Sequence, residues 1–398
     1  ISLSCLLAMG AASCGSGENS QPYTPLQVYF EPVRMDMNVE HLMPYFVNYP
    51  TDWAKMGLRN YPKLLTYQYH YPAWGVSGSS QYEFLPNGRL AEQRRTSLNV
   101  GATGFDVISY EYDNRSNLIQ IKSVDDGHYK RRRADDGFTY NSIGRLIRRD
   151  KNGRGHYDTA TFLYAYHANG ALQSILPERK NGTVSEAGVT IHKMQFDSLA
   201  HLKSFDTPNT FNMFLKGISS YKLGQSVTSY THEGHLCTQA IEKIPVKFDR
   251  GTETLTCTSS FTYNSHGDLA TWTYNGGVYK SKGNSWRVDD MKFTISYEYV
   301  YDEKGNWTQA TITFPANIDD IPALRTYYKA TKNGFTSNQD RSSAVKPGET
   351  PSLTISRSID YWDEKTVASE KENKKNKDSA LRYGYLRFVR QGKIGENP

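Results

Sequence analysis

Several features that define common classes of enzymes and binding proteins are scarce or missing in this sequence. Hydrophobic residues make up only 37% of it, which is low for a compact α/β enzyme. Roughly the central 300 residues show no sustained helical periodicity, which argues against long helices there. No phosphate loop, dinucleotide fingerprint or nucleophile elbow occurs. The net charge of +6 lacks a focused basic field, so we expect no nucleic-acid partner.

Residues that could carry chemistry do not form a recognisable motif. His232-Glu233-Gly234-His235 lacks the spacing of a zinc peptidase and coincides with a predicted turn. Adjacent acidic residues, all in apparent loops, could suggest a glycosidase, but that reaction depends on the separation of two carboxylates in space. These pairs are Asp125-Asp126, Asp135-Asp136, Asp289-Asp290 and Asp319-Asp320. We therefore predict no catalytic, cofactor-binding or metal-binding residues and no enzymatic activity.

The chain opens with an apolar leader. Ile1 to Cys14 has the length of a signal-peptide core and is too short for a transmembrane helix. It has neither a starting Met nor a basic segment, so we expect the natural leader to begin further upstream. Ala11-Ala12-Ser13-Cys14 resembles a bacterial lipobox, with Ala11 where the pattern usually has Leu. The resemblance implies cleavage before Cys14, acylation of its thiol and attachment to a membrane.

Two further cysteines, Cys237 and Cys257, lie in the body of the chain. They are at similar distances on either side of a predicted turn within Val246 to Gly251, so antiparallel neighbours could bring them together. An envelope protein matures in a compartment that permits disulfides. A Cys237–Cys257 disulfide is one expectation, and two free thiols are the other, because the sequence does not set their Cα separation. Two thiols without a Cys-x-x-Cys pair do not predict a zinc site.

A nine-residue pattern recurs eight times and dominates the prediction of the fold. Its turn residue stands at 88, 116, 144, 170, 200, 234, 267 and 305, so successive copies are 26 to 38 residues apart. The position four residues earlier is Tyr or Phe in every copy. The position two residues later is Leu in seven copies and Trp307 in the eighth.

Each part of the pattern has a physical reason. Aromatic residues two positions apart project from one face of a strand. Asp or Asn opens a turn by accepting hydrogen bonds from the next backbone amides. Gly in the left-handed conformation closes a type I turn with a bulge, and the following Leu returns to the buried face. Each copy is therefore predicted to be one β-hairpin, which must pack against its neighbours to bury its apolar face.

The pattern resembles the YD repeat of bacterial Rhs and toxin-shell proteins over about residues 62–314. The best match is Tyr297-Glu298-Tyr299-Val300-Tyr301-Asp302-Glu303-Lys304-Gly305-Asn306-Trp307-Thr308. In large relatives such repeats wind into a sheet that encloses a cavity. Smaller secreted lipoproteins with similar repeats are described as porin-like β-meanders. The resemblance therefore implies an architecture without specifying a ligand, and the chain shows no toxin cargo domain.

From these observations we predict an all-β protein. About sixteen to eighteen strands from eight hairpin repeats form an antiparallel meander, rolled into a curled sheet or barrel-like shell with aromatic residues inside. The predicted segments are a signal peptide (1–13), a lipid anchor, tether and capping segment (14–60), the repeat domain (61–362) and a charged tail (363–398). Within the tail, 381–389 is a candidate final strand.

Two features could contact a ligand. Trp286, in a predicted loop from Gly283 to Asp290, is the candidate ligand-contact aromatic, because exposed rings stack on sugars. Packing beneath that loop is the alternative. Basic residues gather from Lys130 to Arg154. They are either solvated strand faces that keep sheet edges from pairing or a site for an anionic partner, such as an acidic polysaccharide or a phosphorylated lipid headgroup.

Together these features predict a noncatalytic lipoprotein of the bacterial cell envelope, placed on the outer membrane and either facing the periplasm or exposed at the cell surface. Its repeat sheet would be a scaffold or a ligand-binding shell for glycans or other envelope components. The expected partners are the membrane, through the lipid on Cys14, and a polysaccharide or an envelope protein. No cofactor is expected. The alternatives are a secreted, glycan-active hydrolase assembled from loops and a toxin-like encapsulating shell without cargo.

Overall fold

The computed structural model describes residues 52–373, apart from 72–75, 100–101, 115–116, 126–132, 143–144, 153–159, 169–171, 181–182, 185–190, 198–201, 209–211, 216, 219–221, 235, 250, 283–284, 334–344 and 346–347. Its main element is an antiparallel sheet of 18 strands, accompanied by a small two-stranded sheet. The lipid-attachment residue predicted from the sequence, Cys14, and the candidate final strand at 381–389 lie outside the described residues.

The described residues begin with a short helix and continue as strands. The elements of the first half are α1 (Asp52–Lys55), β1 (Pro62–Tyr71), β2 (Val76–Phe84), β3 (Leu90–Asn99), β4 (Ala102–Tyr112), β5 (Leu118–Asp125), β6 (Arg133–Tyr140), β7 (Leu146–Asn152), β8 (Ala160–Tyr166), β9 (Leu172–Pro177), β10 (Arg179–Lys180) and β11 (Thr183–Val184).

The second half contains the longest strands and a second α-helix. Its elements are β12 (His192–Phe196), β13 (Leu202–Thr207), η2 (Met213–Leu215), β14 (Ser226–Glu233), β15 (Leu236–Phe248), β16 (Gly251–Tyr263), β17 (Leu269–Lys282), β18 (Ser285–Tyr301), β19 (Trp307–Thr313), η4 (Ile318–Asp320), α2 (Pro322–Asn333) and β20 (Ser352–Tyr361).

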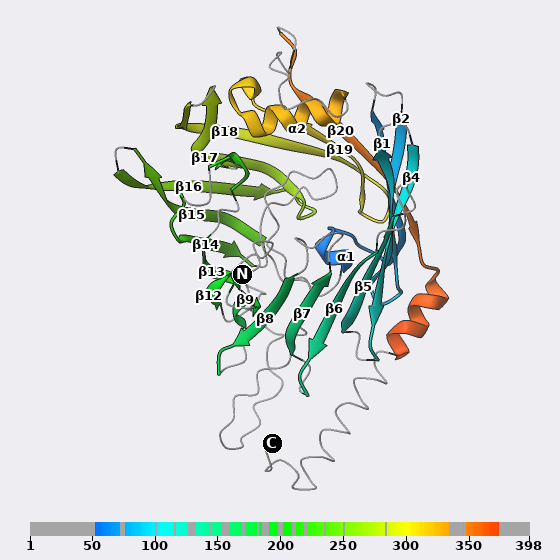
Figure 1. Cartoon of the computed structure of the whole chain (residues 1–398). Coiled ribbons are helices and arrows are strands. Elements are labelled where there is room, and N and C mark those ends of the chain that lie inside the picture. Colours follow the sequence, from blue (N-terminus) through cyan, green and yellow to red (C-terminus); the bar gives the residue numbers. More distant parts are fainter. Residues whose placement is uncertain are drawn as a thin grey trace, which may run out of the picture.

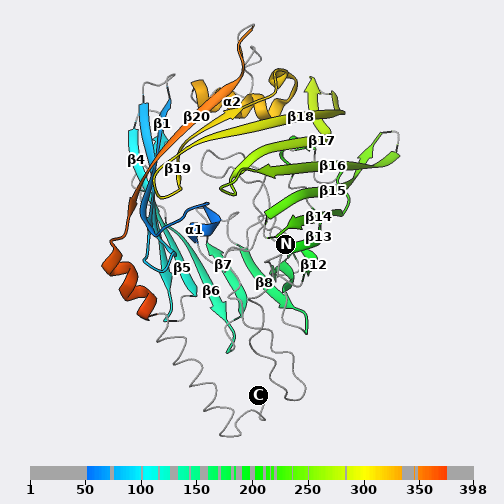
Figure 2. The same cartoon turned by 180° about the vertical axis from the view of Figure 1, so that it is seen from behind.

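The sheet is a meander that the last strand closes into a roll. Strand β20 lies between β1 and β19, with Ile359 opposite Leu65 and Ile355 opposite Ala310. The two ends of the meander, β9 and β12, meet at one bridge, where Ile175 and Ile191 exchange backbone hydrogen bonds of 3.0 and 2.9 Å. The result is a nearly closed, barrel-like sheet (Figure 1 and Figure 2). The predicted all-β meander is therefore confirmed.

The eight predicted hairpins are all present, and each carries a shift of register before its turn. In the hairpin of β6 and β7, Tyr140 lies opposite Leu146 and the shift follows Thr139. The sixth copy, between β14 and β15, departs from this register. Its turn at Gly234 (φ 59°) is tighter, so that Glu233 lies opposite Leu236. The aligned aromatic residue of that copy, Tyr230, consequently lies opposite Ala240.

In five of the hairpins, a tyrosine hydroxyl group joins the hairpin to the one before it. The aromatic ring of one copy reaches back, and its hydroxyl donates to the backbone carbonyl just after the preceding turn. The pairs are Tyr112 to Leu90 (2.7 Å), Tyr140 to Leu118 (2.9 Å), Tyr166 to Leu146 (2.7 Å), Tyr263 to Cys237 (2.6 Å) and Tyr299 to Leu269 (2.8 Å). The repeated aromatic residue therefore supplies both apolar packing and a directed link between copies.

Replacing Tyr166 by phenylalanine is expected to lower the free energy of unfolding by about 1 kcal/mol, because the Leu146 carbonyl loses its hydrogen bond while the ring stays in place. Replacing Tyr166 by alanine is expected to cost about 3 kcal/mol or more, because the ring packs against the apolar cluster of its half of the sheet. Urea unfolding of the two variants would measure both values. Equal losses in the two variants would contradict a separate contribution from the hydroxyl group.

The apolar core lies on the inner face of the roll. Strand β20 alternates strictly: Leu353 and Ile355 are buried, whereas Ser352, Thr354 and Ser356 are exposed. The largest fully buried side chain is Trp272, which contacts the rings of Phe214 and Phe261. One apolar cluster forms within the C-terminal half of the sheet together with β1 and β2, and a second joins β5–β9 to β12 and β13. The predicted inward orientation of the aromatic residues is therefore correct.

Helix α2 lies in the central region, where the sequence predicts no long helix. Pro322 occupies its first turn, where a missing amide hydrogen is tolerated. Leu324 and Tyr328, four residues apart, are fully buried, and the Tyr328 ring packs edge-on against Phe314. The helix covers one end of the roll (Figure 1). Its twelve residues include Thr326, Tyr327 and Tyr328, which favour strands, so the sequence alone does not reveal it.

The beginning of the charged tail is helical. Residues 364–373 form a helix that Asp363 caps, because its carboxylate accepts hydrogen bonds from the backbone amide (2.8 Å) and the hydroxyl (2.7 Å) of Thr366. These hydrogen bonds lower the pKa of the Asp363 carboxyl group. Among the described residues, no helix is long and apolar enough to cross a membrane.

Candidate functional site

The tips of the last two hairpins are built in the same way and point polar groups toward the segment after α1. At the tip between β18 and β19, the Asp302 carboxylate accepts hydrogen bonds from the amides of Lys304 and Asn306, each of 2.9 Å. Gly305, with φ 75°, closes the turn in the left-handed region that Gly favours. The tip between β16 and β17 repeats this arrangement with Asn264 and Gly267.

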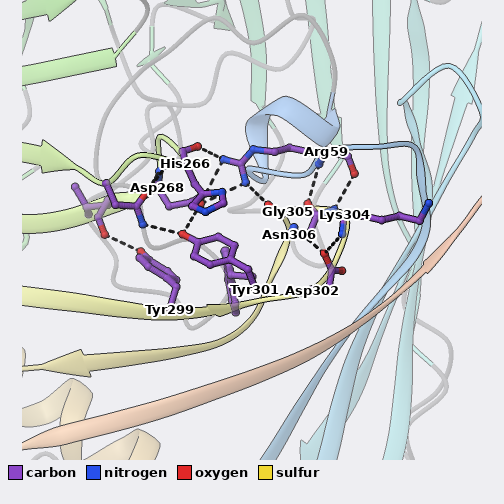
Figure 3. A network of polar contacts seen from close by, with 12 residues as sticks. Arg59, His266, Asp268, Tyr299, Tyr301, Asp302, Lys304, Gly305 and Asn306 are labelled. Atoms are coloured by element: carbon purple, nitrogen blue, oxygen red, sulfur yellow. Dashed lines mark hydrogen bonds and ion pairs between the residues drawn. The ribbon is translucent and has the colours of Figure 1, made fainter.

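Arg59 joins these two tips. Its guanidinium group contacts Asp268 at 3.3 Å and donates to the carbonyl oxygens of Gly305 (2.8 Å) and His266 (Figure 3). The Arg59 backbone exchanges two hydrogen bonds of 2.8 Å with the Asn306 side chain. We call Arg59, Asp268, Tyr301 and Asn306 the tip clamp. It links segments that are far apart in the sequence, since Arg59 and Asp268 are separated by 209 positions.

A tyrosine hydroxyl completes the tip clamp. The Tyr301 hydroxyl donates to Asp268 at 2.9 Å and accepts a hydrogen bond from Asn264 at 2.7 Å, and the Tyr301 ring stacks on His266 at 4.0 Å. Burial, together with the Asp268 carboxylate, raises the pKa of Tyr301 to about 12, so the hydroxyl is protonated at neutral pH. All the groups in the clamp have partners within the protein. The clamp therefore fixes the segment after α1 on the hairpin tips.

The first hairpin holds the other end of this segment. The Asp52 amide donates to the Gly88 carbonyl at 3.0 Å, and the Asp52 carboxylate accepts from the Leu90 amide at 2.8 Å. Trp53 is buried and donates its ring N–H to the Pro62 carbonyl at 2.8 Å. Residues 52–60 thus contact the tips of the first hairpin and of the last two, and α1 lies inside the roll (Figure 1 and Figure 2).

Two arginines are buried on the inner wall, and their surroundings differ. The Arg149 side chain is 8% exposed and its Nη2 atom lies 2.6 Å from the Asp136 carboxylate. Its guanidinium also lies over the rings of Phe138 and Phe162, at 5.7 and 6.0 Å from their centroids. Arg149 is therefore a buried cation that has a carboxylate partner.

Arg357 is a buried cation that has no such partner among the described residues. It is 4% exposed, and its guanidinium lies 3.5 Å from the centroid of the Trp307 ring. Its Nε atom donates to the Trp307 carbonyl at 2.6 Å and its Nη1 atom reaches the Tyr67 hydroxyl at 3.5 Å. Its Nη2 atom is buried and has no hydrogen-bond partner in the part of the chain that the structure describes. Burial lowers the pKa of Arg357 below its ordinary value, and the nearby Tyr67 opposes that shift.

Trp286, the aromatic residue singled out in the sequence, lies in strand β18 and not in the predicted loop. The hairpin of β17 and β18 is longer than expected, since Lys282 is opposite Ser285. The Trp286 ring stacks with Phe248 at 5.3 Å and Tyr279 at 6.0 Å, and the Lys222 ammonium lies 4.6 Å above it. The ring is partly buried by these side chains, as the packing alternative anticipates.

The structure contradicts the disulfide expected between Cys237 and Cys257. Both are free and buried. The turn that joins β15 to β16 lies between Phe248 and Gly251, which places Glu242, and not Cys237, opposite Cys257. Five residues of strand separate the two positions, or about 17 Å, whereas a disulfide needs Cα atoms within about 7 Å. Burial raises the pKa of Cys237 to about 12 and that of Cys257 to about 11, so both thiols are protonated at neutral pH.

Three of the four acidic pairs that the sequence places in loops lie instead in strands or in a short 3-10 helix. Asp135 and Asp136 are in β6, Asp289 and Asp290 are in β18, and Asp319 and Asp320 are in η4. Asp289 contacts Lys280 at 3.1 Å and Arg287 at 2.9 Å, and these cations lower its pKa. Asp125 ends β5, and Asp126 lies outside the described residues. In the part of the chain that the structure describes, no three His, Cys, Asp or Glu side chains gather as a metal site.

The described part of the basic region contributes to the sheet. Arg148 forms an ion pair with Asp150 at 2.9 Å and Arg145 lies over the Tyr166 ring at 5.5 Å.

A cavity of about 460 Å³ lies elsewhere, at the seam between β9 and β12. Its lining residues are Gln173, Ser174, His192, Lys193, Pro208 and Gln225. Next to it, the Asp206 carboxylate forms an ion pair with Lys193 at 2.8 Å and accepts a hydrogen bond from the Gln225 side chain at 3.2 Å.

Three arginines that organise the interior are not predicted from the sequence. Arg357 has a detectable signal, because it takes an apolar position in the alternation Leu353-Thr354-Ile355-Ser356-Arg357-Ser358-Ile359. Arg149 lies in a run of basic residues that reads as a solvated face. Arg59 belongs to a segment without periodicity, and its partners are distant in the sequence.

Comparisons with known proteins find similarity only at the level of solved structures. No model of a protein family and no curated protein matches the chain. The chain is similar to a porin-like protein from Bacteroides uniformis at 10% identity and a TM-score of 0.34, over 75% of this chain and 96% of that one. It is also similar to the structures of TcdB2-TccC3-TEV (10% identity, TM-score 0.27) and of TcdB2-TccC3 without its hypervariable C-terminal region (12%, 0.28), each over 61% of this chain. The chain spans 14% of the length of each of these two chains.

Proposed function

We propose that this protein is a noncatalytic lipoprotein of the bacterial cell envelope whose roll is a ligand-binding shell. The observation that carries the proposal is the nearly closed sheet, in which successive hairpins are linked by tyrosine hydroxyls and the inner wall holds a buried, unpaired arginine. A wall cross-linked in this way is rigid, and a rigid wall holds polar groups in a fixed geometry toward the interior.

The positions of the reactive side chains support a noncatalytic role. Asp136 is committed to Arg149, Asp289 to Lys280 and Arg287, and Asp268 to the tip clamp. A general acid or base has to reach the proton that it transfers. These carboxylates serve instead as partners for cations within the wall, and the two buried thiols are protonated because their pKa values are raised.

The leader supports a location on the envelope. Ala11-Ala12-Ser13-Cys14 resembles a lipobox, and the small and polar residues 15–21 that follow it are predicted to be a flexible tether. A diacylated cysteine at the end of such a tether would hold the roll beside a membrane, because burial of the acyl chains supplies the affinity. The shell would then take up its ligand from the envelope space.

Replacing Cys14 by serine is expected to move the protein from the membrane fraction to the soluble fraction. The chain would be expressed in a bacterium behind Met and two lysines, which supply a basic start to its own leader. Labelled palmitate should be incorporated into the parent and not into Cys14→Ser. Cys237→Ser is the matched control, because that thiol is buried in β15 and should not affect fractionation or labelling. An unlabelled parent that fractionates like Cys14→Ser would contradict the anchor.

A further inference from the structure

We propose that Arg357 binds a small oxyanionic group, a phosphate or a carboxylate, on the inner wall of the roll. The inference deepens the proposed binding-shell function and rests on it. It names the residue that recognises the ligand and the charge that the ligand carries.

The contrast with Arg149 shows what Arg357 lacks. Both guanidinium groups are buried and both lie over aromatic rings, but only Arg149 has a carboxylate, from Asp136. An arginine keeps its charge in proteins, and a buried charge is costly unless it is paired. Asp268 acts on Arg357 only at longer range, and it is already bound to Arg59 and Tyr301. Among the described residues, Arg357 is therefore a buried cation whose counterion the protein does not supply.

The side chains around Arg357 form a polar row on the inner wall. Tyr67 lies opposite Arg357 in the sheet and Ser80 lies opposite Tyr67, so one row crosses β20, β1 and β2. Both Tyr67 and Ser80 are at most 2% exposed. One row further along, Gln93 donates to the Tyr82 hydroxyl at 2.8 Å. An oxyanion beside Arg357 would thus meet hydroxyl donors as well as the guanidinium.

The geometry of Arg357 limits the size and chemistry of the ligand group. Its Nε and Nη1 atoms have protein acceptors, and the Nη2 atom alone has none. Because Trp307 covers one face of the guanidinium at 3.5 Å, the ligand approaches in the plane of the group. Carboxylate and phosphate oxygens accept in that plane with charge-assisted hydrogen bonds, which a water molecule cannot match. The Nη2 atom is shielded from solvent, so a ligand oxygen reaches it only when neighbouring side chains move aside, and a small group requires the least displacement.

Titration of the whole chain with inorganic phosphate, at constant ionic strength with NaCl, tests the proposal. Thermal unfolding and calorimetry should give a saturable response, since a ligand that binds only the folded state raises the Tm. Arg357→Met should lose this response, and Arg357→Lys should bind at least about tenfold more weakly, because lysine lacks the planar fork. Each variant is compared with its own phosphate-free Tm, so a change in intrinsic stability does not affect the comparison. Acetate, titrated in the same way, distinguishes a carboxylate from a phosphate.

The control removes the other buried arginine together with its partner. The double variant Asp136→Asn/Arg149→Met should keep the full phosphate response, because Arg149 is already neutralised. An unchanged response in Arg357→Met would overturn the role of Arg357 and leave a binding shell with its site elsewhere. A parent that responds to neither phosphate nor acetate would overturn the oxyanion proposal, whereas failure of the Cys14→Ser fractionation would overturn the envelope location. The two failures are therefore distinguishable.

Discussion

Replacing Arg149 by methionine is expected to lower the free energy of unfolding by about 3–5 kcal/mol, since removing one partner of a buried ion pair leaves an uncompensated charge. The Asp136 side chain is only 13% exposed and lies 2.6 Å from the guanidinium. The variant also loses contacts with the rings of Phe138 and Phe162. Urea unfolding, followed by circular dichroism, would measure the loss.

The same pair provides an internal control. Asp136→Asn/Arg149→Met removes both charges, and it should recover most of the stability lost in Arg149→Met, because no buried charge is left unpaired. The double-mutant cycle then gives the coupling between the two side chains. If the double variant were as unstable as Arg149→Met, the loss would come from the packing of the arginine side chain and not from its charge.

The second large effect is expected at the tip clamp. Arg59→Ala should lower the free energy of unfolding by about 2–3 kcal/mol, because a charge-assisted contact with a carboxylate and two hydrogen bonds to backbone carbonyls are lost together. The Asp268 side chain is 9% exposed, so solvent replaces the lost partner poorly. Chemical denaturation would measure the loss, and limited proteolysis would show whether residues 52–60 detach from the hairpin tips.

An exposed ion pair serves as the comparison for the tip clamp. Arg94 pairs with Glu92 on β3, and its side chain is 57% exposed. Arg94→Ala should change the free energy of unfolding by less than about 1 kcal/mol, as is usual for solvent-exposed ion pairs. A loss in Arg59→Ala no greater than that in Arg94→Ala would mean that the clamp does not hold the interior segment.

The hairpins were predictable because their determinants are local. Asn264 or Asp302 opens the turn, Gly267 or Gly305 closes it, and an aromatic residue stands four positions before the Gly. Each of these effects acts within nine residues, through backbone conformation and hydrogen bonds to the next amides. The same local reasoning fails at β14 and β15, where a turn of two residues, in place of the five between Tyr140 and Leu146, leaves Tyr230 opposite Ala240.

The cysteines show how a small error in a turn becomes a large error in space. The sequence placed the turn near the right position, but antiparallel register depends on its centre to the residue. With Phe248 opposite Gly251, Cys257 faces Glu242 and the two thiols lie about 17 Å apart along the strands. A similar underestimate of the length of the hairpin that contains Trp286 placed that ring in a loop, when it packs within the sheet.

The amino-acid sequence by itself determined the eight hairpins, their inward aromatic residues and the all-β class, because turn chemistry and two-residue alternation are properties of short segments. The tertiary structure alone decided which segments meet across long distances. It placed β20 between β1 and β19, bound Arg59 to tips more than 200 residues away, and left Arg357 on the inner wall without a carboxylate. The physical reason is that ion pairs and closure depend on how the whole sheet curls, and no short segment encodes the distance between its own side chains and those of a strand at the other end of the chain.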